Sequence, residues 1–199
     1  MKKFLASALA LPVAGIVLAA CSSGSSTAPT TAAASTAVTA SSDCDAYVKA
    51  NPTAMVTTTA DYVMVANMGA SESMYTPEQA ASMHPKSGEI MVSGQMDNGI
   101  NPMSMGAGTS MAYLEVHVCS KATGKAVTDM MPTTTIQGMG SSAMTDSVAV
   151  AEMQGLDRNP ADTHYENNIT VTPGGQYKVV VTMDGQTSTF TITAPMMSK

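Results

Sequence analysis

The chain has 199 residues, of which 44% are hydrophobic and only 12% are charged. This balance excludes a long coiled coil and a charge-rich disordered protein, and it favours one compact domain. Acidic residues outnumber basic ones by 15 to 9, which gives a net charge of −6. Neither nucleic acid nor an anionic membrane surface is therefore expected as a partner.

Residues 1–20 have the pattern of a bacterial lipoprotein signal peptide. Two lysines precede an apolar stretch that is too short to span a bilayer, and Leu18-Ala19-Ala20-Cys21 resembles a lipobox. Cleavage at a lipobox leaves the cysteine to carry diacylglycerol on its sulfur and an acyl chain such as palmitate on its amine. We therefore predict a mature protein that begins at lipidated Cys21 and is anchored at the outer face of the bacterial cell membrane or in the periplasm. A plain secretory leader is the alternative.

The segment 21–42 is predicted to be the lipidated cysteine followed by a tether rich in Ser, Thr and Ala. After Cys21 it contains only Ser, Thr, Ala, Gly and Pro, with the single exception of Val38. No apolar face is present to offset the entropy lost on ordering such a segment. The folded domain is expected over 43–199.

Two cysteines remain once Cys21 is lipidated, namely Cys44 and Cys119. In an oxidising compartment they are expected to form a disulfide. Free thiols that ligate a metal are the alternative.

The folded region has an alternating, strand-like pattern. From residue 111 to 119 the even positions are all apolar, whereas the odd positions are Met111, Tyr113, Glu115, His117 and Cys119. We expect one face of this strand to pack in the core and the other to carry the functional side chains. The segments 177–183 and 186–192 flank Asp184-Gly185, which predicts a hairpin with a two-residue turn.

Further strands are expected at 61–67, 89–96, 126–128, 133–137, 147–153 and 167–172. Thr76-Pro77-Glu78-Gln79 predicts a short helix that ends near Met83, and Asp43 could begin another helix that ends before Pro52. About 7–9 short strands with one or two helices indicate an all-β fold, a β-sandwich.

The chain contains 19 methionines, whereas only Leu114 and Leu156 follow Cys21 as leucines. Methionine could simply replace leucine as core filler, or reflect a compositional habit of the organism. Several methionines, however, lie among Gly, Ser, Asn and Pro, where core filler is not expected. Three of them lead toward Met111 and are candidate thioether ligands for copper, above all Cu(I): Met96, Met103 and Met105.

Three histidines complete the set of candidate ligands. His117 is expected to share a strand face with Glu115 and Met111, and His164 to lie in a loop just before a strand. His84, at the end of the short helix, is the weaker candidate. Mixed His, Met and carboxylate donors suit copper in both oxidation states, whereas His with Glu would also suit zinc.

The motifs 113–117, 162–169 and 175–179, together with Met153, resemble the periplasmic ferrous-iron-transport accessory proteins over residues 60–193. These are copper-binding, immunoglobulin-like β-sandwich lipoproteins, often dimeric and associated with iron uptake permeases. The resemblance implies an immunoglobulin-like sandwich with three metal ligands, Glu115, Met153 and His164. The chain departs from the family pattern at Tyr113, where a histidine is usual. A further family histidine has no clear match, so His117 or His84 would substitute for it.

We therefore expect a lipid-anchored extracytoplasmic protein that captures or buffers copper and assists metal transport, of copper or iron. Its partners would be the membrane, a membrane metal permease and a second copy in a homodimer. A metal-free cell-envelope interaction module is the main alternative, and a hydrolase accessory domain is a third. No catalytic motif occurs, although Glu115 beside His117 could form a general-base pair, so an enzyme is not expected.

Overall fold

The computed structural model describes residues 42–94, 110–139 and 145–196, so the predicted signal peptide and nearly all of the tether lie outside the described residues. Within these ranges, eleven strands form two sheets, accompanied by two short α-helices. The predicted β-sandwich is thus confirmed, with more strands than the expected 7–9.

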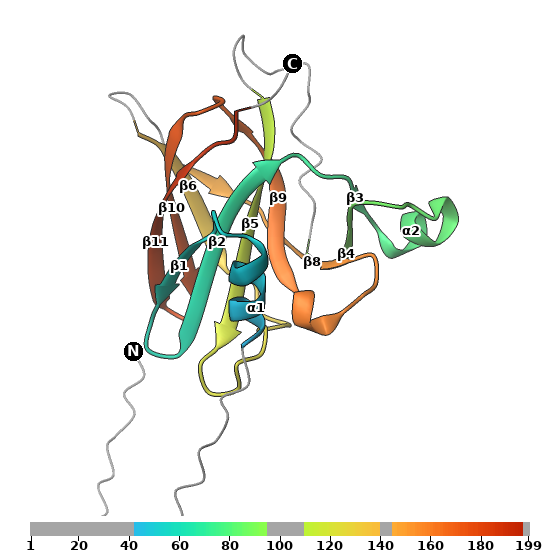
Figure 1. Ribbon diagram of the computed structural model, residues 1–199, viewed down its shortest axis with the longest axis horizontal. Helices are drawn as coiled ribbons and strands as arrows, with labels where there is room; N and C mark the ends of the chain where they lie inside the picture. Colours follow the sequence, from blue (N-terminus) through green and yellow to red (C-terminus); the bar gives the residue numbers. More distant parts are fainter. Residues whose placement is uncertain (1–41, 95–109, 140–144, 197–199) are drawn as a thin grey trace, which may run out of the picture. The chain divides into compact units, whose positions relative to one another are not determined.

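The larger sheet has seven strands, and every neighbouring pair except the last is antiparallel. Its order is β1 (Met55–Thr58), β2 (Tyr62–Ala70), β5 (Ser110–Ser120), β9 (His164–Val171), β8 (Ala151–Gly155), β4 (Glu89–Ser93) and β3 (Met74–Tyr75). The long strand β5 lies between β2 and β9, and it carries the alternating pattern that stands out in the sequence (Figure 1).

The smaller sheet has four strands in the order β11 (Gln186–Thr193), β10 (Gln176–Met183), β6 (Thr133–Gly138) and β7 (Thr145–Val148). The even positions of β5 face this sheet and are buried with its apolar side chains, among them Val179, Val181, Phe190 and Ile192. The prediction that one face of this strand packs in the core is confirmed.

The predicted hairpin is confirmed as β10 and β11. Asp184 and Gly185 connect the strands with φ angles of 47° and 72°, the left-handed conformation that this two-residue turn requires.

Both predicted helices are also present. Helix α1 (Asp43–Ala50) begins with a capping box at Ser42, and α2 (Pro77–Met83) begins with a capping box at Thr76. In each box the cap side chain and the third helical residue exchange hydrogen bonds, which satisfies backbone groups that the first turn leaves without helical partners.

Three of the predicted strands differ in the structure. The segment 147–153 is not one strand, because β7 ends at Val148 in the smaller sheet and β8 begins at Ala151 in the larger one. Residues 126–128 form only an isolated bridge from Ala126 to Cys119. Strand β9 begins at His164, so this histidine lies in a strand and not in the loop before one. The two short strands β1 and β3 were not predicted.

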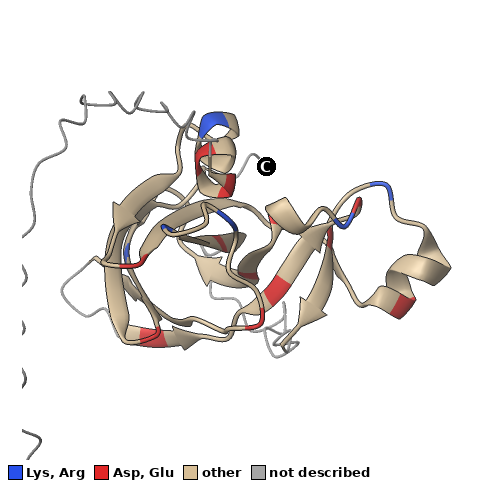
Figure 2. Ribbon diagram, turned by 90° about the horizontal axis from the view of Figure 1, so that it is seen from below, with Lys and Arg blue, Asp and Glu red and all other residues tan. Residues whose placement is uncertain are grey.

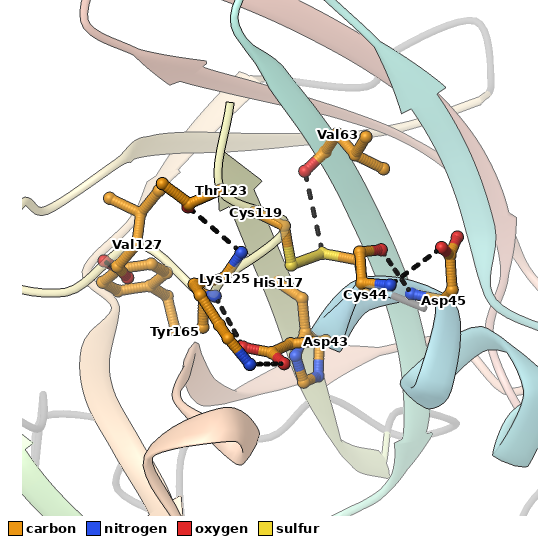
Figure 3. The surroundings of a disulfide bond; sticks show 12 residues. Asp43, Cys44, Asp45, Val63, His117, Cys119, Thr123, Lys125, Val127 and Tyr165 are labelled. Atoms are coloured by element: carbon orange, nitrogen blue, oxygen red, sulfur yellow. Dashed lines mark hydrogen bonds and ion pairs between the residues drawn. A yellow bond between two sulfur atoms is a disulfide. The ribbon is translucent and has the colours of Figure 1, made fainter. Parts of the chain in front are cut away.

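Helix α1 lies against β2 and β5, on the face of the larger sheet that points away from the smaller one (Figure 1). The predicted disulfide joins Cys44 in α1 to Cys119 in β5, with their Cα atoms 6.0 Å apart. Figure 3 shows Cys119 and His117 projecting from the same strand, beside Cys44. The outer face of the sheet is therefore partly covered by a helix that is covalently attached to it.

Candidate metal centre

The outer face of the larger sheet brings polar side chains from adjacent strands together. The odd positions of β5 point to this face, as do His164 and Glu166 of β9. The strand register places Glu115 opposite Glu166 and places Met153 of β8 opposite His164. Residues that are far apart in the sequence therefore become neighbours on one buried surface.

Glu115, His117 and His164 form the centre of this surface. One potential ligand atom from each lies within 4.8 Å of the others. Nε2 of His117 is 2.8 Å from Oε1 of Glu115, and the two imidazole rings are 5.0 Å apart between centroids. The exposed fractions are 7% for Glu115, 2% for His117 and 1% for His164. A small cation could contact all three side chains with little movement.

His164 has one satisfied and one unsatisfied ring nitrogen. Its Nδ1 lies 2.7 Å from the backbone oxygen of Asp162, so Nδ1–H donates to that carbonyl. Its Nε2 is buried and, among the described residues, has no hydrogen-bond partner. The nearest carboxylate oxygens belong to Glu166 at 3.6 Å and Glu89 at 3.8 Å. Histidines that bind metal ions commonly donate their second ring N–H to a backbone carbonyl, as Nδ1–H of His164 does here.

Helix α1 contributes Tyr47 to the same cluster. Its hydroxyl donates to Oε2 of Glu115 and accepts a hydrogen bond of 3.0 Å from the amide of Asn67. Its ring lies over His117, with 3.7 Å between the ring centroids. Tyr47 therefore contacts two of the three central residues.

A cavity of about 400 Å³ lies between α1, the short 3-10 helix Pro160–Asp162 and the sheet. Among the described residues, its lining includes no Lys or Arg, whereas six of the lining side chains are acidic: Asp43, Glu72, Glu89, Glu115, Asp162 and Glu166. Figure 2, in which Asp and Glu are red, shows acidic positions on several separate elements. Glu89 and Asp162 form with His164 a second group of ligand atoms within 4.8 Å of one another. The negative charge of this cavity favours cations.

The acidic surroundings shift the pKa values of the cluster. Burial disfavours the charged form of His164, but Glu166, Glu115 and Glu89 more than compensate and raise its pKa to about 10. Burial raises the pKa of Glu89 to about 8. Burial lowers the pKa of His117 and keeps this imidazole neutral. Burial opposes the charged form of Glu115 as well, yet His117, His164 and Tyr47 hold the pKa of this carboxyl below its usual value.

Met153 is the predicted sulfur donor that lies in this region. It is fully buried, at 0% exposure, directly opposite His164 in the register of β8 and β9. Met91 of β4 lies opposite Met153 in turn. Cross-strand partners of this kind have their side chains on the same face of a sheet.

Two other sequence candidates, Met111 and His84, do not join the centre. Met111 lies on the same strand face, but four residues before Glu115, which separates their Cα atoms by about 13 Å along the strand. Its sulfur accepts a hydrogen bond from Thr170 instead. His84 is the exposed C-cap of α2, a helix that contacts β3 and β4. The loop candidates Met96, Met103 and Met105 and the lipidation site Cys21 lie outside the described residues.

Four residues of the cluster were not predicted as site residues: Tyr47, Glu89, Asp162 and Glu166. Asp162 and Glu166 stand within the motif around His164, and their spacing of two residues on either side was an available signal. Tyr47 and Glu89 had no such signal, because their positions depend on the docking of α1 and on the pairing of β4 with β8.

Within the described residues, no helix is long and apolar enough to cross a membrane. Searches of family models and of curated proteins found no match to this chain. A crystal structure of a DUF4426 family protein from Pseudomonas aeruginosa PAO1 is a distant structural neighbour, with a TM-score of 0.44 and 11% identity over 74% of this chain and 99% of that chain. These comparisons give no support at family level to the resemblance to iron-transport accessory proteins.

Proposed function

We propose that this protein is a lipid-anchored, extracytoplasmic metal-binding protein, and that Glu115, His117 and His164 bind copper with Met153 as a thioether donor. The observation that carries the proposal is the buried Nε2 atom of His164, which has no hydrogen-bond partner among the described residues. A ring nitrogen of His164 lies within 4.8 Å of ligand atoms of Glu115 and His117. Leaving a buried polar atom without a partner costs about 1–3 kcal/mol, so a ligand for that atom is expected.

The surrounding charge supports a cation as that ligand. Oxygens of Glu89 and Glu166 are also buried and lack hydrogen-bond partners within the described part of the chain. Carboxylates buried together repel one another, and the repulsion is relieved by protonation of one of them or by a positive charge between them. The same carboxylates favour a positive charge at His164 and raise its pKa, so a metal ion bound at this nitrogen would take the place of a proton.

The donor types favour copper over the alternatives. Two imidazoles and one carboxylate also suit zinc, but a thioether adds little to a zinc site. Met153 is fully buried opposite His164, and sulfur from methionine is a preferred donor for Cu(I). We therefore infer that the centre binds Cu(II) mainly through histidine and glutamate and retains Cu(I) through histidine and methionine.

The experiment compares His164→Ala and His117→Ala with His84→Ala, which removes an exposed histidine from α2 and serves as the matched control. Cu(II) affinity is measured by calorimetry. We expect the two buried-site variants to lose at least about tenfold in affinity, which is 1.4 kcal/mol, and the control to match the wild type. A wild-type domain that binds copper more weakly than about 10 µM, or about −7 kcal/mol, would contradict the proposal and favour the metal-free interaction module.

The role of Met153 is tested with Met153→Leu, which conserves volume, against Met183→Leu in the core between the sheets. Cu(I) affinity is measured by competition with a chelator. We expect Met153→Leu to weaken Cu(I) binding by about tenfold and to leave zinc binding unchanged, whereas Met183→Leu changes neither. Equal Cu(I) affinity in the two variants would remove Met153 from the ligand set.

The proposed physiological role is capture or buffering of copper, with transfer of copper or iron to a membrane permease. If the 21 residues after Cys21 form the tether that the sequence predicts, their number corresponds to an average span of about 25 Å between the domain and its anchor. That distance is short enough for the domain to reach the mouth of a membrane protein beside it. The same role is the one that the sequence resemblance to iron-transport accessory proteins implies.

A further inference from the structure

Helix α1 is attached to the sheet beside the metal centre by several independent contacts. Cys44 forms the disulfide with Cys119, and both cysteines pack with Val65 in a small apolar cluster that is separate from the main core. The carboxylate of Asp43 accepts a hydrogen bond of 3.0 Å from the backbone of Ala126. An isolated helix of eight residues is only marginally stable in water, so these attachments determine where α1 lies.

The disulfide is attached close to the ligands. Cys119 follows His117 by two residues and Glu115 by four on the same face of β5, which corresponds to about 7 Å and 13 Å along the strand. Tyr47 follows Cys44 by three residues, so the two side chains leave neighbouring positions of α1. The disulfide and the ring of Tyr47 therefore both connect α1 to the same short section of β5.

Tyr47 contacts both central residues of β5, since its hydroxyl donates to Glu115 and its ring lies over His117. The amide of Asn67, on the neighbouring strand β2, donates to the same hydroxyl and orients it. Along with Ala46 and Ala50, Tyr47 also forms the α1 side of the acidic cavity. It thus restrains two of the candidate ligands, Glu115 and His117.

We infer that Tyr47 is a positioning residue of the metal centre and that the Cys44–Cys119 disulfide acts on metal affinity by holding Tyr47 in place. The inference rests on the proposed function, because it concerns the same centre. An oriented carboxylate loses less conformational entropy when it binds a metal ion than a free one does. Cu(II) binding, which uses Glu115, should therefore depend on Tyr47 and on the disulfide, whereas Cu(I) binding should depend on Tyr47 much less.

The first test is Tyr47→Phe, which keeps the ring over His117 and removes the hydroxyl. Its matched control is Tyr177→Phe, which removes a phenol that accepts a backbone hydrogen bond from Thr172 in a distant part of the fold. We expect Tyr47→Phe to weaken Cu(II) binding by about tenfold and to change the Cu(II) absorption and paramagnetic resonance spectra. Cu(I) affinity should stay within about twofold of the wild type, and Tyr177→Phe should leave both affinities unchanged.

The second test is a double-mutant cycle with Cys44→Ser and Cys119→Ser, in which serines avoid new thiol ligands for copper. If the disulfide acts through Tyr47, breaking it should weaken Cu(II) binding in the wild-type background and have little further effect beside Tyr47→Phe. Additive losses would overturn the link between the disulfide and Tyr47. Unchanged Cu(II) affinity and spectra for Tyr47→Phe would overturn the positioning role. Because this variant keeps the disulfide, its result does not depend on whether the serine variant folds.

A metal-free measurement separates this inference from the proposed function. Diethyl pyrocarbonate modifies accessible histidines, and mass spectrometry locates the modified ring. We expect loss of the disulfide to speed modification of His117, because Tyr47 moves away from it. The rate of modification of the exposed His84 should not change. A wild-type protein that binds no copper would refute the proposed function alone, whereas unchanged modification of His117 would refute the coupling of the disulfide to Tyr47.

Discussion

His117 and His164 lie at the same centre and yet differ in charge, because their partners differ. His117 has one carboxylate partner, and burial lowers its pKa. His164 faces Glu166, Glu89 and Glu115, which raise its pKa to about 10. One imidazole is therefore ready to ligate a metal at neutral pH, whereas the other must release a proton first. Copper binding is expected to release protons and to weaken as the pH falls.

Glu89 provides a pH-dependent prediction at the scale of one residue. Burial raises its pKa to about 8 from the ordinary value of 4.5. Between these values the folded state binds a proton that the unfolded state has released, so this group makes the free energy of unfolding fall as the pH rises. In metal-free protein, Glu89→Gln should match the wild type near pH 5 and exceed its stability at pH 8–9. Urea denaturation at several pH values measures the difference.

The matched control for Glu89→Gln is Glu78→Gln, which changes an exposed carboxylate in the first turn of α2. Its pKa is lowered by hydrogen bonds at the start of the helix, so the neutral variant should gain no stability at high pH. A difference between wild type and Glu89→Gln that stays constant across the pH range would show that the carboxyl of Glu89 titrates normally.

Local sequence signals determined most of the elements. The capping boxes at Ser42 and Thr76 begin the two helices, and the alternation of β5 continues over its whole length. The strand predictions were wrong where contacts between distant parts of the chain outweigh the local sequence pattern. The sequence predicts a single strand where the structure has β7 and β8. The chain passes from one sheet to the other at Ala149 and Val150, and these two residues are as apolar as the strand residues on either side, so no local signal marks the break.

The β10–β11 turn provides a prediction at the scale of one element. Gly185 has a φ of 72°, and a Cβ added there would have no atom within 4 Å. Gly185→Ala should therefore destabilise the domain through backbone conformation alone, by about 1 kcal/mol. Thermal denaturation measures it. Asp184→Asn is the control, since asparagine tolerates the left-handed conformation, and a loss of about 1 kcal/mol there as well would contradict this explanation.

The whole molecule uses the two faces of one sheet for different purposes. One face of the larger sheet packs on the smaller sheet to form the main core, and the other holds the proposed metal centre beneath α1. Leu114 and Glu115 are consecutive in the sequence but belong to opposite faces. The core can therefore keep β5, β8 and β9 in register while none of its own side chains takes part in the proposed metal binding.

Leu114 tests the contribution of the core. It is fully buried between the sheets, so Leu114→Ala should destabilise the domain by about 3 kcal/mol. Met183→Leu, which nearly conserves volume in the same core, should cost less than about 1.5 kcal/mol. Chemical denaturation measures both variants. Equal stabilities would show that the space left by Leu114 is filled by neighbouring side chains.

The membrane anchor is a prediction that concerns the whole protein and depends on residues outside the described structure. Cys21→Ala should abolish lipidation and move the protein from the membrane fraction to the soluble fraction. Detergent-phase partitioning and mass spectrometry of the mature N-terminus measure the change. Unchanged membrane retention of the variant would refute the lipid anchor.

The sequence by itself determined the period of the strands, the two helix starts, the hairpin and the pairing of the two cysteines, because each depends on neighbouring residues or on simple counting. It also predicted Glu115 and His117 as neighbours, since residues two apart on a strand share a face. Only the tertiary structure decided that His164 and Met153 lie opposite each other, that Met111 lies too far away, and that Tyr47 and Glu89 join the centre. These contacts depend on strand register and on helix docking, which are determined by long-range burial that no local pattern specifies.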